Sequence, residues 1–337
     1  MTTNNSLNKC KMPGAGLASM AIAIVVYVYS CVALAQENYP ARPITLIVGY
    51  SAGGQSDILG RKLASRLGPV LNQPVVVQNK DGATSTIATR LVAEAKPDGY
   101  TLLLGGGSGM IIAPLVMKVL YDPVKDFKQV ARLTSAMLSI SVHPSVPADN
   151  LRELVALIKA NPGKYSYASS GFGGGDHLTG ELFKQLAGNL DLLHVPYKGA
   201  APALTDVIAG RVPVFITTLS SIYQYSKTGK IRLLAVTGAT RSTAAPEIPT
   251  AVEAGVQGLV AEGVNFLTVP ARTPPQVIEI LRAAVAKIIA DPTFVDELRK
   301  LQYEPITEST PEIADEYVKS EIEKWRNVVV TAKVAPQ

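Results

Sequence analysis

The stretch Gly49-Tyr50-Ser51-Ala52-Gly53 fits the G-x-S-x-G pattern, in which hydrolases present a nucleophilic serine at a turn between a strand and a helix. Taken alone, the pattern would make Ser51 the nucleophile of an ester hydrolysis. In the hydrolases with this pattern, however, a histidine follows the serine and the acid. The last histidine is His194, so the final 143 residues (337 − 194) contain none. We therefore expect no catalytic residue and no enzyme, with a serine esterase using Ser51 as an alternative.

The same loop has a second interpretation, as a cradle for an anion. Glycines after a strand let the backbone approach a ligand closely, and the helix that follows presents amide groups without partners. Serine hydroxyls add donors, and Asp57 can cap the helix. A plain strand-to-helix turn with a cap explains the loop equally well. The candidate ligand-binding residues in this loop are Tyr50, Ser51, Gly53, Gly54, Ser56 and Asp57.

A second stretch, residues 167–178, has the same construction: a strand, two serines, several glycines and then a helix. Two such loops facing each other would hold a small anion between them, which favours the binding interpretation. Asp176 and His177 could form a catalytic dyad, but adjacent residues at a helix start rarely face each other, so a helix cap with a hydrogen-bonded histidine is favoured. The candidates here are Ser169, Ser170, Gly171, Gly174 and Asp176.

The elements that must position these loops are alternating strands and helices. Apolar, β-branched runs predict strands at 44–50, 74–79, 100–105, 138–143, 165–170, 192–197, 212–218 and 231–238, with helical periodicity after most of them. From Pro274 the pattern is mostly helical, and a helix is expected to begin at Thr310-Pro311. The alternation predicts parallel sheets with helices on both faces, which bind ligands at the carboxyl ends of strands.

The first 35 residues have the composition of an export signal. Lys9 and Lys11 precede an apolar run that closes on Ala33-Leu34-Ala35, a pattern typical of signal peptidase cleavage. An uncleaved membrane anchor is the alternative. Cleavage near Ala35 would leave 302 residues (337 − 35), without cysteine, and 30 basic (32 − 2) against 27 acidic residues. That excludes disulfides and thiolate sites, and the mild charge gives no indication of nucleic acid binding.

Six phrases, in order along the mature chain, resemble the Bug family of periplasmic solute-binding proteins, the receptors of tripartite tricarboxylate transporters. The phrases are YPARPITLIVGYSAGGQSD, QPVVVQNKDGA, AKPDGYTLLLG, NPGKYSYASSG, HVPYKGAAPALTDVIAGRV, and GKIRLLAVTGATR with IPTAVEAG. The resemblance implies an α/β fold of two domains that close like a flytrap on a ligand in the cleft between them. It also implies domain one at residues 36–138 plus 266–337 and domain two at 139–265.

The resemblance further implies a small carboxylate ligand, held by the two strand-to-helix loops. Thr84, Ser85 and Lys198 are expected to complete the site, although Lys198 fits a solvated surface lysine as well. The family usually has a proline where this chain has Ala52 and small residues where it has Asp176. An acidic residue is common at the position of Thr217, and its loss would remove a partner for a ligand ammonium group. We therefore expect a mono- or dicarboxylate without an amino group.

The function expected from the sequence is a periplasmic receptor, a monomer, that delivers this carboxylate to the membrane permease of a tripartite transporter. The alternative is a receptor whose ligand-bound form is recognised by a membrane sensor kinase, so that binding leads to signalling and not to transport. No cofactor is expected, and the three histidines lack the spacing of metal ligands. Trp325, the only tryptophan, falls in the last helix and is expected to report domain closure poorly.

Overall fold

A computed structural model describes Met1 and residues 39–334, so the predicted export signal and its cleavage site lie outside the described residues. The chain divides into two units, residues 1–41 and 42–337, and every element named below belongs to the second. Within the described residues, no helix combines the length and apolar character needed to cross a bilayer.

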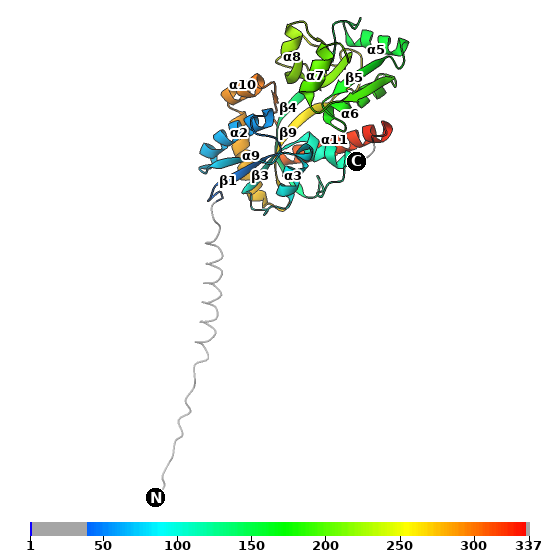
Figure 1. The fold of residues 1–337 in the computed structure, drawn as a ribbon. Coiled ribbons are helices and arrows are strands. Elements are labelled where there is room, and N and C mark those ends of the chain that lie inside the picture. The colour runs from blue at the N-terminus through cyan, green and yellow to red at the C-terminus, as the bar shows by residue number, and fades with distance from the viewer. Residues whose placement is uncertain (2–38, 335–337) are drawn as a thin grey trace. The chain divides into compact units, whose positions relative to one another are not determined.

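Three parallel strands, in the order β2-β1-β3, carry the first candidate loop. They are β1 (Ile44–Val48), β2 (Val75–Asn79) and β3 (Thr101–Gly106), and each is followed by helical structure: α2 (Gln55–Leu71), η1 (Ala83–Ser85) with α3 (Thr86–Ala93), and η2 (Ser108–Ile112) with α4 (Ala113–Val116). Ile44, Leu46 and Leu102–Leu104 are almost fully buried, as expected for strands covered by helices on both faces. Figure 1 shows these elements from blue to cyan.

A second parallel group, in the order β7-β5-β6, carries the second candidate loop. It consists of β5 (Tyr165–Ser169), β6 (Leu192–Pro196) and β7 (Val214–Thr218), followed by α6 (Gly175–Leu186), α7 (Ala200–Ile208) and α8 (Leu219–Lys227) respectively. Helix α5 (Leu151–Ala160) precedes this group and begins at Asn150, whose side chain accepts the amide of Glu153. The predicted strand–loop–helix units are therefore confirmed in both halves.

Two long antiparallel strands join the groups, which corrects the expectation of purely parallel sheets. Strand β4 (Phe127–Val142) pairs with β9 (Glu262–Pro270) along residues 127–137 and with β7 along residues 138–142. The short strands β8 (Arg232–Val236) and β10 (Glu304–Pro305) also pair with β4. The sequence revealed only residues 138–142 of β4. Two irregularities in the register of β4 with β9, at residues 129–131 and 132–134, interrupt the alternation of polar and apolar side chains in the part that was missed.

The pairing along β4 and β9 bears on where the chain passes between its two halves. The partner of β4 changes from β9 to β7 between Met137 and Leu138. Strand β9 pairs with this first part of β4 over its whole length and with β3 at residues 265–268. The preceding residue, Ala261, donates its amide to Thr237, just after β8. We propose two domains, as the resemblance implied, but with the second crossing near residues 261–262 in place of 265–266 and the first near 137–138.

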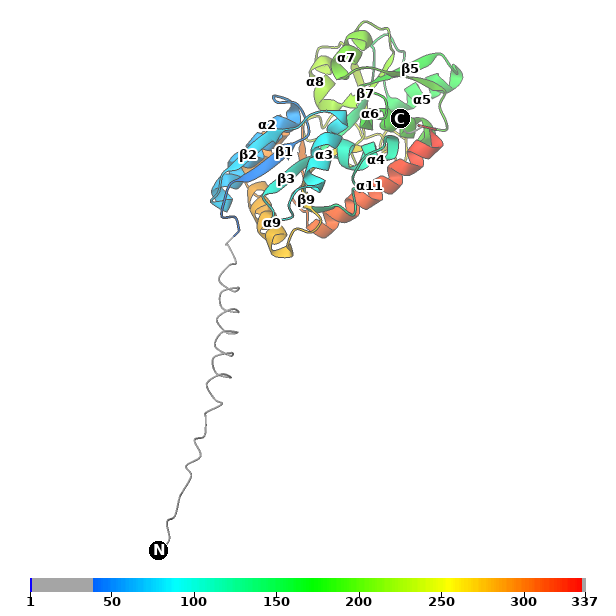
Figure 2. The same ribbon diagram turned by 60° about the horizontal axis from the view of Figure 1, so that its bottom comes forward.

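Three helices at the C-terminal end, α9 (Pro275–Ile289), α10 (Pro292–Lys300) and α11 (Pro311–Thr331), complete the structure. Helix α11 begins as predicted, with Thr310 accepting the amide of Ile313 and proline in the first turn. It then runs beside both halves, as Figure 2 shows. Its Lys324 donates to the carbonyl of Val260, and Gln185 of α6 donates to the carbonyl of Val328.

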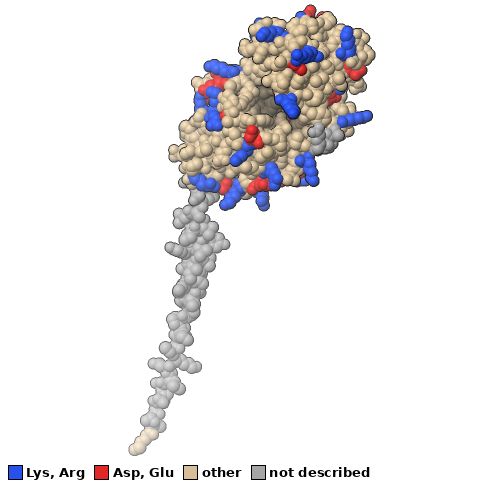
Figure 3. All heavy atoms as spheres, viewed as in Figure 1, with Lys and Arg blue, Asp and Glu red and all other residues tan. Residues whose placement is uncertain are grey.

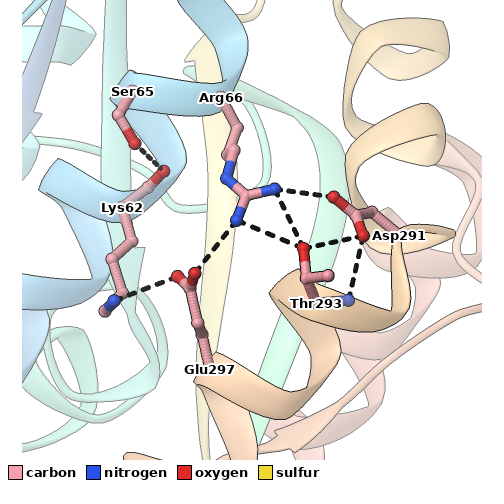
Figure 4. A network of polar contacts seen from close by, with 6 residues as sticks. All are labelled: Lys62, Ser65, Arg66, Asp291, Thr293 and Glu297. Carbon is pink, nitrogen blue, oxygen red and sulfur yellow. Dashed lines mark hydrogen bonds and ion pairs between the residues drawn. The ribbon is translucent and has the colours of Figure 1, made fainter.

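Helix α10 is joined to α2 by a network of ion pairs, drawn in Figure 4. Arg66 of α2 contacts Asp291 at 2.6 Å and Glu297 at 2.9 Å, and Lys62 contacts the other oxygen of Glu297 at 3.0 Å. Just beyond α10, the carbonyl of Leu301 accepts the side-chain amide of Gln55, the first residue of α2. The C-terminal segment thus holds the helix that starts at the first candidate loop.

Candidate functional site

The two candidate loops have nearly the same backbone conformation. Gly53 and Gly173 have φ values of 80° and 72°, in the left-handed region that favours glycine. Gly54 and Gly174 then cap α2 and α6 with φ/ψ of −74°/167° and −81°/170°. Neither capping glycine has a side chain that could bond the first amide groups of its helix, although in α6 the side chain of Asp176 accepts the amide of His177.

Asp57 holds the first loop in this conformation. Its Oδ2 accepts the Gly53 amide at 2.8 Å and Arg61 at 2.9 Å, and its Oδ1 accepts the side-chain amide of Asn79 at 2.9 Å. The hydrogen bond from Arg61 and the Gly53 amide lower the pKa of Asp57 to about 2, although the residue is only 2% exposed. Because its oxygens are occupied from within, Asp57 is placed to shape the loop rather than to contact a ligand.

Tyr50 lies across the carboxyl end of β3. Its phenol oxygen would be 3.0 Å from a Cβ at Gly106, so this glycine makes room for the ring. Burial raises the pKa of Tyr50, and a hydrogen bond with Ser108 offsets part of the rise, so the phenol stays neutral and can donate. Ser108 has no signal in the sequence that singles it out, because only the folded sheet brings it to Tyr50.

Ser56, in the first turn of α2, lies next to the phenol of Tyr303. Burial raises the pKa of Tyr303 to about 12, and its hydrogen bonds with Ser56 and Asn265 oppose that rise. Asn265, on β9, also donates to Thr134 on β4 at 3.0 Å. Sequence reasoning missed Tyr303, Asn265 and Thr134, since each is far along the chain from the loop and lies in no recognisable motif.

The segment after β2 has strained backbone geometry. Ala83, Thr84 and Ser85 have φ values of 43°, 56° and 72°, a left-handed conformation that costs non-glycine residues about 1 kcal/mol or more each. Thr84 is exposed, whereas Ser85 is 1% exposed and its hydroxyl has no hydrogen-bond partner among the described residues. The Ser85 hydroxyl fits only because position 49 is glycine, where a Cβ would lie 1.9 Å from it.

The second loop is held by its own polar side chains. Asp176, which is 7% exposed, accepts the amides of Ser170 and His177. Burial raises the pKa of Asp176, and these hydrogen bonds oppose the rise. Ser169 is fully buried and its hydroxyl contacts Nε2 of His194 at 2.7 Å and the carbonyl of Gly171 at 3.0 Å. Ser170 is exposed and Gly171 is half-buried.

Two further predicted residues lie on neighbouring strands. Lys198 is exposed after β6, in a segment fixed to the second loop by the amide of Gly199, which donates to the carbonyl of Ser170 at 2.9 Å. No ion pair joins Lys198 to another described residue. Thr217 lies near the carboxyl end of β7, is 2% exposed, and accepts the Ser139 hydroxyl through its carbonyl.

The segment that follows β3 meets the start of α6 at a cavity that no residue of the first loop lines. A cavity of about 50 Å³ is lined by Gly107 and Ser108 of that segment, by Gly175 and Thr179 of α6, and by Glu262 of β9. Ser108 is also close enough to Tyr50 to lower the pKa of its phenol, so this residue lies near both the first loop and the start of α6. The space-filling view in Figure 3 shows the surface hollowed between the two halves.

No contact joins the hydroxyl of Ser51, the candidate nucleophile, to a histidine among the described residues. The Ser51 hydroxyl donates to Asp81 at 2.8 Å. His143 contacts Ser145, His177 accepts the Gly173 amide and His194 contacts Ser169. Asp176 bonds the backbone of His177 and not its ring, and the residue that caps α6 is Gly174. The described residues hold no group of three or more potential metal ligands.

Comparison with known proteins places this geometry in a family. A family model described as the tripartite tricarboxylate transporter family receptor matches residues 59–333. The chain is 33% identical to Protein BugT of Bordetella pertussis over 87% of its own length and 90% of BugT. A structure of an R. palustris protein with adipate is 33% identical, with a TM-score of 0.76, covering 89% of this chain and all of that one.

A second solved structure is similar over the same region. MatC from Rhodopseudomonas palustris, with bound malate, is 28% identical with a TM-score of 0.71, covering 86% of this chain and all of MatC. These similarities confirm the resemblance and the two-domain α/β fold that the sequence motifs implied. The chain belongs to the tripartite tricarboxylate transporter receptor family, the TctC or Bug type of periplasmic solute-binding proteins.

Proposed function

We propose that this protein is a receptor that captures a small carboxylate between its two halves. The observation that carries the proposal is the pair of glycine loops with matching backbone geometry, each opening a helix whose capping residue is a glycine. Such helix starts favour anions through their amide groups and their partial positive charge. The relatives solved with adipate and with malate support a carboxylate as the anion.

The proposed contacts come from both halves. From the first half they are Tyr50, Ser51, Gly53, Gly54, Ser56, Thr84 and Ser85, and from the second Ser169, Ser170, Gly171, Gly174, Lys198 and Thr217. Tyr50 supports this role as a neutral phenol at the strand end. Ser85 supports it as a buried hydroxyl without a partner among the described residues. Asp57 and Asp176 act by holding the loops, because backbone amides occupy their carboxylates.

The proposed ligand has no amino group. An ammonium group in a cleft needs a carboxylate or several carbonyl acceptors. Position 217 is threonine here, and the two acids of the loops already have partners. A mono- or dicarboxylate without nitrogen therefore fits these groups better than an amino acid.

We further propose that the mature chain works in the periplasm, after cleavage near Ala35, and delivers its ligand to the membrane permease of a tripartite transporter. Deleting the gene should then abolish uptake of the bound carboxylate. Retained uptake, together with loss of a transcriptional response to the carboxylate, would instead favour the receptor of a sensor kinase. The esterase alternative has no support in the structure, because the Ser51 hydroxyl bonds Asp81 and all three histidines bond elsewhere.

The ligand can be sought directly in the purified mature protein. Native mass spectrometry should show a co-purified carboxylate, and a thermal-shift screen should find carboxylates that raise the melting temperature in a saturable way. A ligand that binds only the native state at 100 times its Kd adds about 2.7 kcal/mol to the free energy of unfolding. An empty protein that no aliphatic or aromatic carboxylate stabilises would overturn the proposal.

A further inference from the structure

His177 in the second loop takes the place that Asp57 takes in the first. Each is the third residue of its helix, counted from the capping glycine at 54 or 174. The Gly53 amide donates to Asp57 at 2.8 Å, and the Gly173 amide donates to Nδ1 of His177 at 2.9 Å. Both bonds close the same turn over the glycine with positive φ.

This contact requires one protonation state of the imidazole. Nδ1 can accept the Gly173 amide only while it carries a lone pair, so the neutral ring has its proton on Nε2. An imidazolium has a proton on both nitrogens and would face the Gly173 amide donor to donor. The turn of the second loop therefore depends on a neutral His177.

A stack of aromatic rings holds the imidazole in place. His177 lies against His194, with ring centres 3.9 Å apart and planes 10° apart, and Phe172 lies beside both rings, at 4.9 Å from His177 and 6.4 Å from His194. Tyr167 of β5 stacks on the far side of His194 at 4.8 Å. The stack thus runs from the exposed tip of the loop into the core, where the Tyr167 hydroxyl donates to Glu181 at 2.8 Å.

The groups around the stack keep both histidines neutral near pH 7. Burial lowers the pKa of His177 to about 4, and Lys184 adds to the effect. Burial likewise lowers the pKa of His194 to about 4. The charged groups that face the pair are Asp176, Glu181 and Lys184 on α6, and Lys184 pairs with Glu181 at 2.8 Å. Tyr167 on β5 and His194 on β6 are the other titratable neighbours.

We propose that His177 is the positioning residue of the second loop, and that its neutral Nδ1 fixes the Gly173 turn that aims the start of α6 at the ligand. The ring stack fixes the orientation of the imidazole, and the Gly173 amide donates a hydrogen bond to its Nδ1. The effect of His177 on ligand binding rests on the proposed carboxylate site. The effect of His177 on the Gly173 turn is independent of that proposal.

Two variants separate the acceptor atom from the ring. His177→Asn places an amide oxygen near the position of Nδ1 but removes the ring, whereas His177→Phe keeps the stack and removes the acceptor. Hydrogen exchange of the Gly173 amide, measured by NMR on the full mature protein without ligand, reads the turn directly. We expect His177→Phe to lower its protection roughly fivefold to tenfold, as for the loss of one hydrogen bond, and His177→Asn to restore most of it. His143→Asn, which changes a histidine outside the site, should leave it unchanged.

Acidification provides a second readout that a purely structural residue would not give. In the wild type, protection of the Gly173 amide should fall as the pH is lowered from 6 to 4, while in His177→Asn it should stay level. Equal protection in wild type and His177→Phe, or the same pH profile in wild type and His177→Asn, would overturn the inference.

Titration with adipate and malate then tests the link to the ligand. We expect the affinity of whichever one the wild type binds to fall in His177→Phe and to recover in His177→Asn. A changed turn with unchanged affinity would refute that link, and binding of neither acid by the wild type would count against the proposed ligands while the exchange result still stands.

Discussion

At the scale of single residues, the structure separates groups that shape the loops from groups that face outward. The sequence identified both loops, because glycine, serine and a strand before them are local features. It could not show that Asp57 is enclosed by Asn79, which comes from the end of another strand, or that Asp176 turns back onto Ser170. The polar partners of a buried acid depend on tertiary packing, so an acid that binds a ligand and an acid that holds a loop look alike in a sequence.

Replacing Asp57 by asparagine should destabilise the protein by about 2 kcal/mol, because a buried acceptor of Arg61 and the Gly53 amide loses its charge. The lowered pKa of Asp57 means that its contribution is complete above the ordinary value of 3.8 and is lost as the pH falls toward 2. The difference in melting temperature from wild type should therefore narrow below pH 4. Asp98→Asn, at an exposed ion pair with Arg42, is the control and should cost under about 1 kcal/mol.

Glycine substitutions test the proposed contact at the start of α6. Gly175 is the first residue of the helix and a Cβ there would meet nothing within 4 Å, so Gly175→Ala should stabilise the unliganded protein by about 0.5 kcal/mol. The same methyl group would occupy space at the proposed ligand contact and should weaken carboxylate binding at least tenfold. Gly53→Ala has equal space but a φ of 80°, so it should lower the melting temperature as well. Undiminished affinity in Gly175→Ala would place the ligand elsewhere.

At the scale of elements, α10 supports the first loop through α2. The apolar faces of both helices were visible in the sequence, but the contact between the helices was not. Arg66, Asp291 and Glu297, which form that contact, cannot be told from ordinary surface charges in a sequence. The same limit applies to β4, whose irregular register with β9 hid the strand that joins the two halves. Local periodicity predicts a helix or a strand. Contacts between residues that are far apart along the chain decide which other element lies beside it.

Arg66→Met should destabilise the protein by about 1 kcal/mol, because two ion pairs are lost while the aliphatic part of the side chain is kept. The loss should shrink in 1 M salt, where charges at a partly exposed interface are screened. Thermal unfolding at low and high salt measures both values. Arg90→Met, at a single exposed pair with Glu94, is the matched control and should have almost no effect. A loss that is independent of salt would assign the effect of Arg66 to packing.

At the scale of the whole molecule, Trp325 lies in the last helix as expected, and its place in the cavity makes it a candidate reporter of closure. It is 4% exposed and lines the same cavity as Leu138 of β4, Gly175 of α6 and Glu262 of β9. Its indole nitrogen donates to Glu321 at 2.9 Å. A ligand that changes the approach of the halves should therefore change the intensity or wavelength of tryptophan emission in a saturable way. Emission unaffected by a ligand that raises the melting temperature would mean that the cavity does not move.

Calorimetric titration of the mature protein with matched pairs of ligands tests the central claim most directly. Malate and aspartate differ by a hydroxyl against an ammonium group, and adipate and 2-aminoadipate differ by the ammonium group alone. We expect saturable binding of at least one plain dicarboxylate, and binding at least a hundredfold weaker for its amino counterpart. Tight binding of aspartate or 2-aminoadipate, with no binding of malate or adipate, would contradict it.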